Sequence, residues 1–154
     1  MTHSEKAREL FMQGYNCSQA VFGAFCDVTG VDFDTAVRIS SSFGGGMGRM
    51  REVCGAVSGM FMVAGILYSS DDPKNNQLKS EHYARIQELA GVYRQSNGSI
   101  ICRELLGLGG KDSSPNASPR TAEYYKKRPC ADLVAEAAQI MDDYIAAHPI
   151  TQKS

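Results

Sequence analysis

Apolar residues recur at three- and four-residue intervals along almost all of the 154-residue chain. This spacing places them on one face of an α-helix, whereas strict alternation would indicate a half-buried strand. No alternating β-branched run of convincing length is present. The sequence therefore predicts an all-α fold, a single-domain helical bundle of about five to six helices. Its clearest apolar stripe consists of Leu133, Val134, Ala137, Ile140, Met141, Tyr144 and Ile145.

The length of the chain fits one domain covering residues 1–154. Apolar residues from Leu78 to Tyr93 predict a second long helix, and Asn97-Gly98 is a typical signal for its end. The one long irregular loop is Gly107 to Pro119. It connects rather than divides, because the residues after it are too few for an independent domain.

Composition excludes some partners and favours one compartment. A net charge of −1 gives no electrostatic reason to expect a nucleic acid as partner. The segment from Val53 to Ser70 is uncharged, but its glycines and serines favour a buried helix over a membrane span. The polar N-terminus lacks the apolar part of a secretory signal, so we expect a cytoplasmic protein. Thiols there are normally reduced, so the five cysteines are expected to be catalytic, metal-binding or buried.

Three cysteines fall in predicted first turns of helices. Asn16 and Gln19 form a capping-box pattern that places Cys17 at the first helical position. Ser99 is the expected N-cap before Cys102, and Pro129 precedes Cys130 at the start of the C-terminal helix. Because free N–H groups and the positive end of the helix dipole favour a thiolate, these positions suit reactive or metal-binding thiols.

The fourth cysteine, Cys54, stands among six glycines in the segment 44–59. We expect residues 44–48 to form a turn whose N–H groups create an anion-binding nest, and a helix to begin near Met50. Small residues on that helix would let another helix or thiol approach closely. The glycines expected to contribute to a cofactor-binding site are Gly45, Gly46, Gly55 and Gly59.

The order and spacing of Cys17, Cys54-Gly55-Ala56-Val57-Ser58-Gly59, Cys102 and Cys130 resemble the C_GCAxxG_C_C family of redox-active proteins. The resemblance runs from Tyr15 to about Tyr144 and includes the preceding glycine-rich segment. It implies that these four cysteines converge on one site. A more distant likeness to split-Soret-type cytochromes implies a [2Fe–2S] centre and a dimer. Arg51 and Cys26 lie outside the family pattern.

Several functions fit these residues. We favour thiol–disulfide or electron-transfer chemistry through Cys17, Cys54, Cys102 and Cys130, with Cys54 as the attacking thiol because glycines leave it accessible. In the alternatives, the same four cysteines ligate a [2Fe–2S] cluster or, less favoured, zinc, or the chain is a helical interaction module without catalysis. A thiol-dependent oxidoreductase, a redox partner or small-molecule substrate, and a homodimer all remain open.

The fifth cysteine and a run of basic residues lie outside the predicted cysteine site. Cys26 is nine residues after Cys17 and is expected to face the opposite side of the same helix as a buried apolar residue. The basic run 126–128 is expected to be a solvated surface, or alternatively to favour a thiolate at Cys130 or attract an acidic partner.

Overall fold

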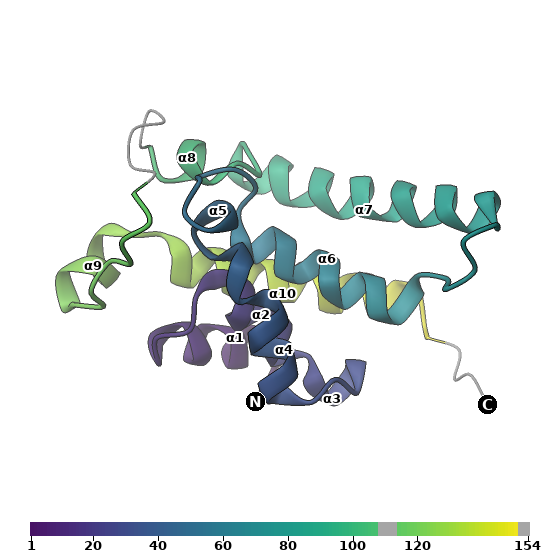
Figure 1. Cartoon of the computed structure of the whole chain (residues 1–154), viewed down its shortest axis with the longest axis horizontal. Helices are drawn as coiled ribbons and strands as arrows, with labels where there is room; N and C mark the ends of the chain where they lie inside the picture. The colour runs from purple at the N-terminus through teal and green to yellow at the C-terminus, as the bar shows by residue number, and fades with distance from the viewer. Residues whose placement is uncertain (108–113, 151–154) are drawn as a thin grey trace.

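The computed structural model describes residues 1–107 and 114–150, except for the side chain of Lys127. Within these residues the chain is helical apart from loops and one isolated β-bridge, which confirms the all-α prediction (Figure 1). Six of the described helices have eight or more residues, as expected. The elements in chain order are α1 (His3–Met12), α2 (Cys17–Ala24), α3 (Cys26–Thr29), α4 (Phe33–Ser40), η1 (Ser41–Phe43), α5 (Gly44–Met47), α6 (Gly55–Tyr68), α7 (Asn76–Asn97), α8 (Cys102–Leu105), α9 (Ala122–Lys127) and α10 (Cys130–Ala147).

Helices α2 and α6 cross at the centre of the molecule. Nearly every residue of α2 is buried, because α1, α4, α6 and α10 all pack against it. The crossing with α6 is close: a Cβ added to Gly59 would lie 2.8 Å from the carbonyl oxygen of Ser18 and 2.9 Å from the Cβ of Val21. Gly59 is therefore a packing residue between these two helices.

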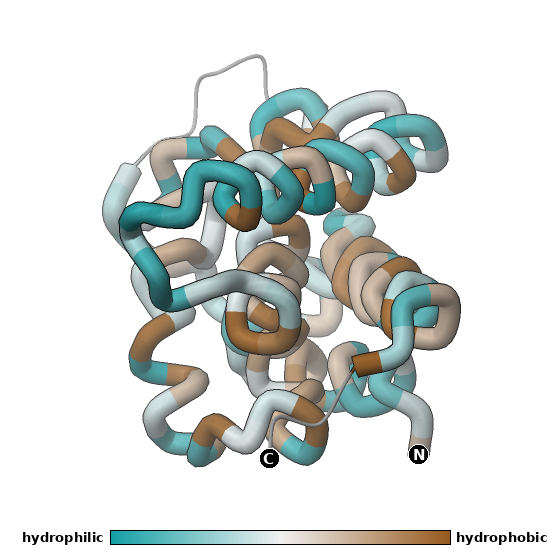
Figure 2. The backbone as a smooth tube through the Cα atoms, turned by 90° about the vertical axis from the view of Figure 1, so that its right-hand side faces the viewer, coloured by the Kyte–Doolittle hydropathy of each residue, from teal (hydrophilic) through white to brown (hydrophobic). Residues whose placement is uncertain are grey.

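Helix α10 completes the core, with α1 against one side and α6 and α7 against others. Its buried residues are Cys130, Leu133, Val134, Ala135, Ala137, Ala138, Ile140 and Met141, so most of the predicted stripe is confirmed. Helix α7 buries only Leu89, Ala90 and Tyr93 and ends at Asn97, followed by Gly98 in the left-handed conformation, as predicted. In Figure 2 the hydrophilic segments lie mainly towards the outside of the bundle.

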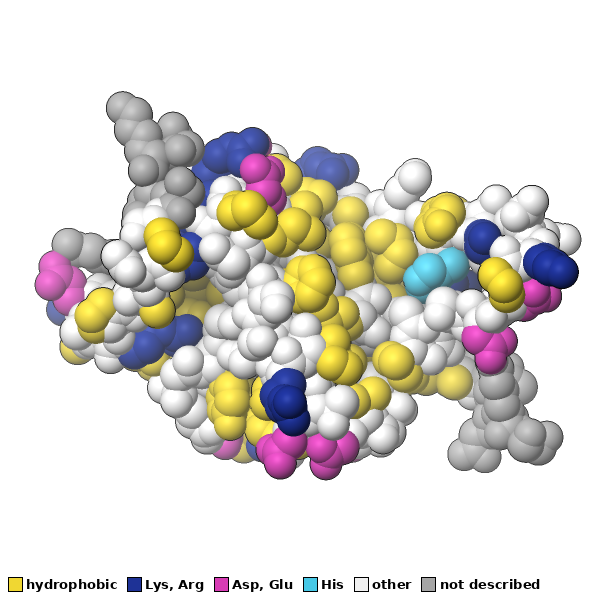
Figure 3. All heavy atoms as spheres, viewed as in Figure 1, with side chains coloured by type: hydrophobic (Ala, Val, Ile, Leu, Met, Phe, Trp, Pro, Cys, Tyr) yellow, Lys and Arg dark blue, Asp and Glu magenta, His cyan; other side chains and the backbone are white. Residues whose placement is uncertain are grey.

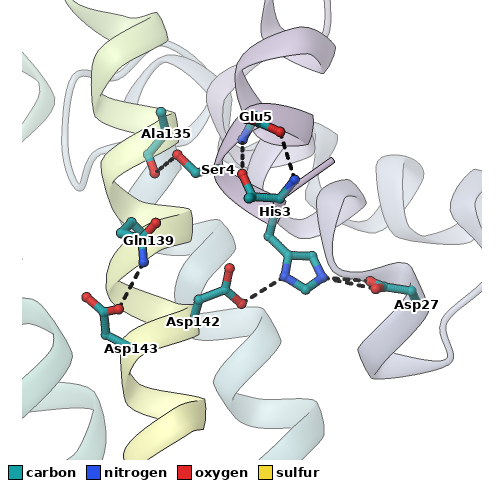
Figure 4. A network of polar contacts seen from close by, with 9 residues as sticks. His3, Ser4, Glu5, Asp27, Ala135, Gln139, Asp142 and Asp143 are labelled. Carbon is teal, nitrogen blue, oxygen red and sulfur yellow. Dashed lines mark hydrogen bonds and ion pairs between the residues drawn. The ribbon is translucent and has the colours of Figure 1, made fainter.

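A histidine between two carboxylates joins α1 to α10 and α3 (Figure 4). His3 Nδ1 lies 2.8 Å from Asp142 Oδ1, and His3 Nε2 lies 2.9 Å from Asp27 Oδ1. The imidazole stacks on Phe25, with the ring centroids 4.2 Å apart. Ser4 Oγ donates to the carbonyl of Ala135 at 2.9 Å. These contacts fix the N-terminal helix on the core.

The glycine-rich segment forms a turn, as expected, but the turn is left-handed. Residues 45–49 all have positive φ, and two of them, Met47 and Arg49, are not glycines. A left-handed turn costs a residue with a side chain about 1–2 kcal/mol, which explains why glycines fill the other three positions. The short element α5 is therefore not a regular right-handed helix.

The prediction that the next helix begins near Met50 is wrong: α6 begins at Gly55. Arg51 also has positive φ, and Val53 forms an antiparallel β-bridge with Ile101, so this stretch is not part of a right-handed helix. In the part of the chain that the structure describes, no helix is both long enough and apolar enough to cross a membrane.

Candidate functional site

The four family-matching cysteines meet beside one cavity, each from the start of a helix. Cys17, Cys102 and Cys130 are the first residues of α2, α8 and α10, and Cys54 immediately precedes α6. All four line the same cavity of about 440 Å³. This convergence agrees with what the family resemblance implied. The cavity lies at the end of the molecule that carries α5, α8 and α9, which are labelled in Figure 1.

A short backbone pairing holds Cys54 next to Cys102. The Cys54 N–H donates to the carbonyl of Ile100 at 2.7 Å, and the Cys102 N–H donates to the carbonyl of Glu52 at 2.6 Å. These bonds flank the Val53–Ile101 bridge. Helix α8 starts directly after this pairing, with Ile101 rather than the expected Ser99 as its N-cap. Ser99 Oγ instead accepts from the Ile101 N–H at 2.9 Å.

Two glycines leave space for the cysteine side chains. A Cβ on Gly46, which has φ of 74°, would lie 2.6 Å from the Cβ of Cys102. A Cβ on Gly55 would lie 3.1 Å from the Cβ of Cys17. Gly45, Gly46 and Gly55 line the cavity, whereas Gly59 does not.

The carbonyls of the glycine turn accept hydrogen bonds from the N–H groups of residues that follow it. The N–H groups of Arg49, Arg51 and Glu52 donate to the carbonyls of Gly44, Gly45 and Gly46 at 3.2, 3.3 and 2.9 Å. An anion-binding nest formed by the N–H groups of residues 44–48, and a role for the glycines in binding a cofactor, both stay predictions.

Cys17 and Cys130 form a polarised pair. A hydrogen bond from the Cys17 thiol lowers the pKa of Cys130, and the guanidinium groups of Arg128, Arg120 and Arg51 lower it further against the opposing effect of burial. The same hydrogen bond, together with burial, raises the pKa of Cys17 well above the usual value. Within the pair, Cys17 is the hydrogen-bond donor and Cys130 is the thiol whose pKa is lowered.

Cys54 has a different environment. Its side chain is 5% exposed, and burial raises its pKa to about 11. A hydrogen bond with the phenol of Tyr93, whose oxygen is 3.5 Å from the Cys54 sulfur, and the N–H groups of Ala56 and Val57 act in the opposite direction but are weaker. The glycines around Cys54 thus serve close packing and do not expose the sulfur.

Cys102 lies beside a buried arginine. Arg51 Nη1 is 3.7 Å from the Cys102 sulfur, and Arg51 is 5% exposed. Burial raises the pKa of Cys102, while the hydrogen bond and charge of Arg51 lower it in part. The helix-start argument therefore predicts position correctly but thiolate character only for Cys130, because burial and neighbouring sulfurs outweigh the helix termini at the other sites.

The zinc and [2Fe–2S] alternatives would both need the four cysteines as ligands. Among residues 1–107 and 114–150, no group of three or more His, Cys, Asp or Glu side chains is arranged to hold a metal ion. This finding concerns a single metal ion such as zinc; the [2Fe–2S] alternative stays a prediction, and we derive no step through either group.

Cys26 lies apart from the cysteine site, whereas one residue of the basic run lies beside it. Cys26 is half-buried at the start of α3, a helix separate from that of Cys17, and does not join the other four cysteines. Lys126 is exposed, while Arg128 is half-buried and lines the cavity. The Lys127 side chain lies outside the described residues.

Four further residues in the site were not predicted as site residues from the sequence: Arg51, Tyr93, Arg120 and Tyr124. Arg120 donates to the carbonyls of Phe11 and Tyr15, both at 2.9 Å, and packs over the ring of Tyr124 at 5.0 Å. The sequence pattern places Tyr93 only on the apolar face of a long helix. Arg51 contacts Cys102 and Tyr93 contacts Cys54 across 51 and 39 residues of sequence, so no local pattern marks these two.

Comparisons with known proteins agree with this geometry. The family model described as "Putative redox-active protein (C_GCAxxG_C_C)" matches residues 15–144, which include all four clustered cysteines. Searches of curated proteins and of solved structures found no match. Since the family model covers most of the chain, the protein belongs to the C_GCAxxG_C_C family.

Proposed function

We propose that the protein carries out thiol–disulfide chemistry, with Cys130 as the attacking thiol and Cys17 as the resolving thiol. The observation that carries this proposal is geometric: Cys17 and Cys130 each begin a helix and line the same cavity as Arg120 and Arg128. The hydrogen bond that Cys130 accepts from Cys17 lowers the pKa of Cys130. The thiolate is the nucleophile in disulfide exchange. This assignment replaces Cys54, because Cys54 is buried and has a pKa raised to about 11.

The reaction proceeds in two exchanges. The Cys130 thiolate attacks one sulfur of a substrate disulfide, so that a Cys130–substrate disulfide forms while the substrate S–S bond breaks. The other half of the substrate leaves as a thiolate and takes up a proton. Cys17 then loses its proton and attacks the Cys130 sulfur, which forms a Cys17–Cys130 disulfide and releases the second half as a thiol. The substrate gains two electrons, and an external dithiol returns the cysteine pair to the reduced state.

Cys54 and Cys102 have a supporting role in this proposal. Both are buried, both have raised pKa values, and Tyr93 and Arg51 hold their sulfurs by hydrogen bonds. They pack beside the reacting pair and stay protonated at neutral pH.

Trapping the mixed disulfide tests the proposal. In Cys17→Ser the resolving thiol is missing, so we expect incubation with 2-hydroxyethyl disulfide to leave one mercaptoethanol adduct on Cys130, seen by peptide mass spectrometry. Cys54→Ser is the matched control and should form no lasting adduct, because Cys17 still resolves it. An adduct on Cys54 or Cys102 in the Cys17→Ser protein would contradict the assignment.

A further inference from the structure

Arginines surround the cavity that the cysteines line. Arg49, Arg51, Arg120 and Arg128 all contribute to its wall, and no Asp or Glu among the described residues does. The chain as a whole has a net charge of −1, so this concentration of positive charge is local. A cleft lined by charges of one sign attracts small ions of the opposite sign. On the face shown in Figure 3, several Lys and Arg side chains gather at the end that carries α8 and α9.

Two of these arginines keep their charge uncompensated by any described carboxylate. Arg120 contacts backbone carbonyls, the Tyr125 hydroxyl and aromatic rings, and Arg128 lies over the ring of Tyr124 at 5.6 Å. All of these partners are neutral. Arg49 and Arg51 have additional partners, so we base the inference on Arg120 and Arg128.

Two of these arginines lie near one particular cysteine, Cys130. Arg120 and Arg128 are both close enough to stabilise negative charge on the Cys130 sulfur. The same charges would therefore also stabilise a thiolate that leaves from a disulfide under attack at Cys130. The cavity volume of about 440 Å³ falls in the range of small-molecule sites.

We propose that the cavity selects a small disulfide that carries carboxylate groups, held beside Cys130 by Arg120 and Arg128. The disulfide part of this inference rests on the proposed function, whereas the preference for a small carboxylate-bearing molecule does not. Arg128, whose guanidinium lies over the ring of Tyr124, suits this role because a planar guanidinium binds a carboxylate through two parallel hydrogen bonds. Arg120 already donates to the carbonyls of Phe11 and Tyr15 and contributes mainly its charge.

Exchange rates with three disulfides of different charge test the preference. The probes are 3,3′-dithiodipropionate, a dianion, 2-hydroxyethyl disulfide, which is neutral, and cystamine, a dication. Each rate is divided by the rate of the same disulfide with free dithiothreitol, which cancels differences in leaving group. We expect the dianion to react roughly 3- to 30-fold faster than the neutral probe after this correction, because opposite charges attract in a partly screened site.

Arg128→Gln should remove most of this preference, while Lys126→Gln, which removes an exposed charge two residues away, should keep it. The ratio of the two corrected rates separates selection from reactivity, because a changed thiolate population at Cys130 affects both probes equally. Equal corrected rates for all three probes, or fastest reaction with cystamine, would overturn the inference and leave the proposed function intact.

A binding measurement without redox chemistry separates the two proposals further. The thioether 3,3′-thiodipropionate should shift NMR signals of residues lining the cavity, and neutral 2,2′-thiodiethanol should not. Binding of the anion with no disulfide exchange would defeat the proposed function and keep the anion preference. Absence of binding by the anion, in a protein that still exchanges the neutral disulfide, would defeat the preference.

Discussion

Cys130 and Cys54 line the same cavity, but the Cys17–Cys130 pair and the Cys54–Tyr93 pair have opposite electrostatic environments. Arginines and a donated thiol hydrogen bond favour negative charge on Cys130. Around Cys54, burial dominates, and its partner Tyr93 is a neutral phenol that is fully buried. The comparison shows that position at a helix start does not by itself make a cysteine reactive. The hydrogen bond from Cys17, together with the neighbouring arginines, makes Cys130 the clustered thiol with a lowered pKa.

The largest expected difference between the two pairs is in reactivity. With iodoacetamide at neutral pH, Cys130→Ser should lower the fast thiol-alkylation rate by about 100-fold, because only the thiolate attacks and the other sulfurs have raised pKa values. Cys54→Ser should change this rate by less than about twofold. Mass spectrometry of the alkylated peptides identifies the site, and fast alkylation at Cys54 would break the comparison.

The pH dependence of stability should show the buried Cys54 directly. Its pKa is 9.0 in an unfolded chain and about 11 in the fold, so the unfolded state loses this proton first as the pH rises. Stability due to Cys54 is present below pH 9 and is lost between pH 9 and 11. The loss amounts to about 3 kcal/mol in the free energy of unfolding.

Urea titrations from pH 8 to 11 measure this effect, and Cys54→Ala should show a shallower decline than the unsubstituted protein. The lowered pKa of Cys130 has the opposite effect on stability. The folded state loses the Cys130 proton first, so stability due to this group rises with pH until the pH passes the pKa of a cysteine in an unfolded chain. An identical slope in the Cys54→Ala protein would show that Cys54 is not held protonated by the fold.

Two glycines of α6 should respond in opposite ways to the same substitution. Gly59→Ala introduces a Cβ 2.8 Å from the Ser18 carbonyl oxygen and should cost about 1–3 kcal/mol through overpacking. Gly65→Ala meets no atom within 4 Å and should stabilise the protein by about 0.5–1 kcal/mol, since alanine favours a helix. Chemical denaturation measures both, and stabilisation by Gly59→Ala would contradict the close crossing of α2 and α6.

Leucine at Gly55 or Gly59 should destabilise the protein more strongly than alanine at Gly59. At Gly55 a larger side chain would collide with Cys17 and should prevent assembly of the cysteine site. A folded Gly55→Leu protein whose Cys130 alkylates at the unsubstituted rate would show that the glycine is not needed for the approach of the thiols.

The smallest expected effect concerns Tyr93. Tyr93→Phe removes the hydrogen bond to the Cys54 sulfur and should lower the free energy of unfolding by about 1 kcal/mol. It should also raise the pKa of Cys54, since that bond favours the thiolate. The alkylation rate of Cys130 should not change, and a change there would show that the two pairs are coupled.

Local signals in the sequence predict the parts of the site that depend on helix starts. The capping box of Asn16 and Gln19 places Cys17 correctly, and Pro129 marks the start of the helix that carries Cys130. Gly98 marks the end of α7 in the same way. Each of these signals acts within one turn of the chain, so a single sequence is sufficient to read it.

The parts that were missed depend on contacts between distant residues. The Val53–Ile101 bridge delays the start of α6, and positive φ values at Met47, Arg49 and Arg51 make the preceding turn left-handed. Arg120 reaches the site by donating to carbonyls more than a hundred residues earlier in the chain. Periodicity and capping carry no information about such pairings, so the electrostatic difference between the cysteines could not be read from their positions.

Disulfide mapping after mild oxidation tests the central claim most directly. The reduced protein would receive one equivalent of an oxidising disulfide, be quenched in acid, and be digested for peptide mass spectrometry. The Cys17–Cys130 hydrogen bond predicts one dominant intramolecular disulfide that joins these two residues and is reversed by dithiothreitol. A dominant disulfide containing Cys54, or a protein whose clustered thiols all remain free, would contradict the account.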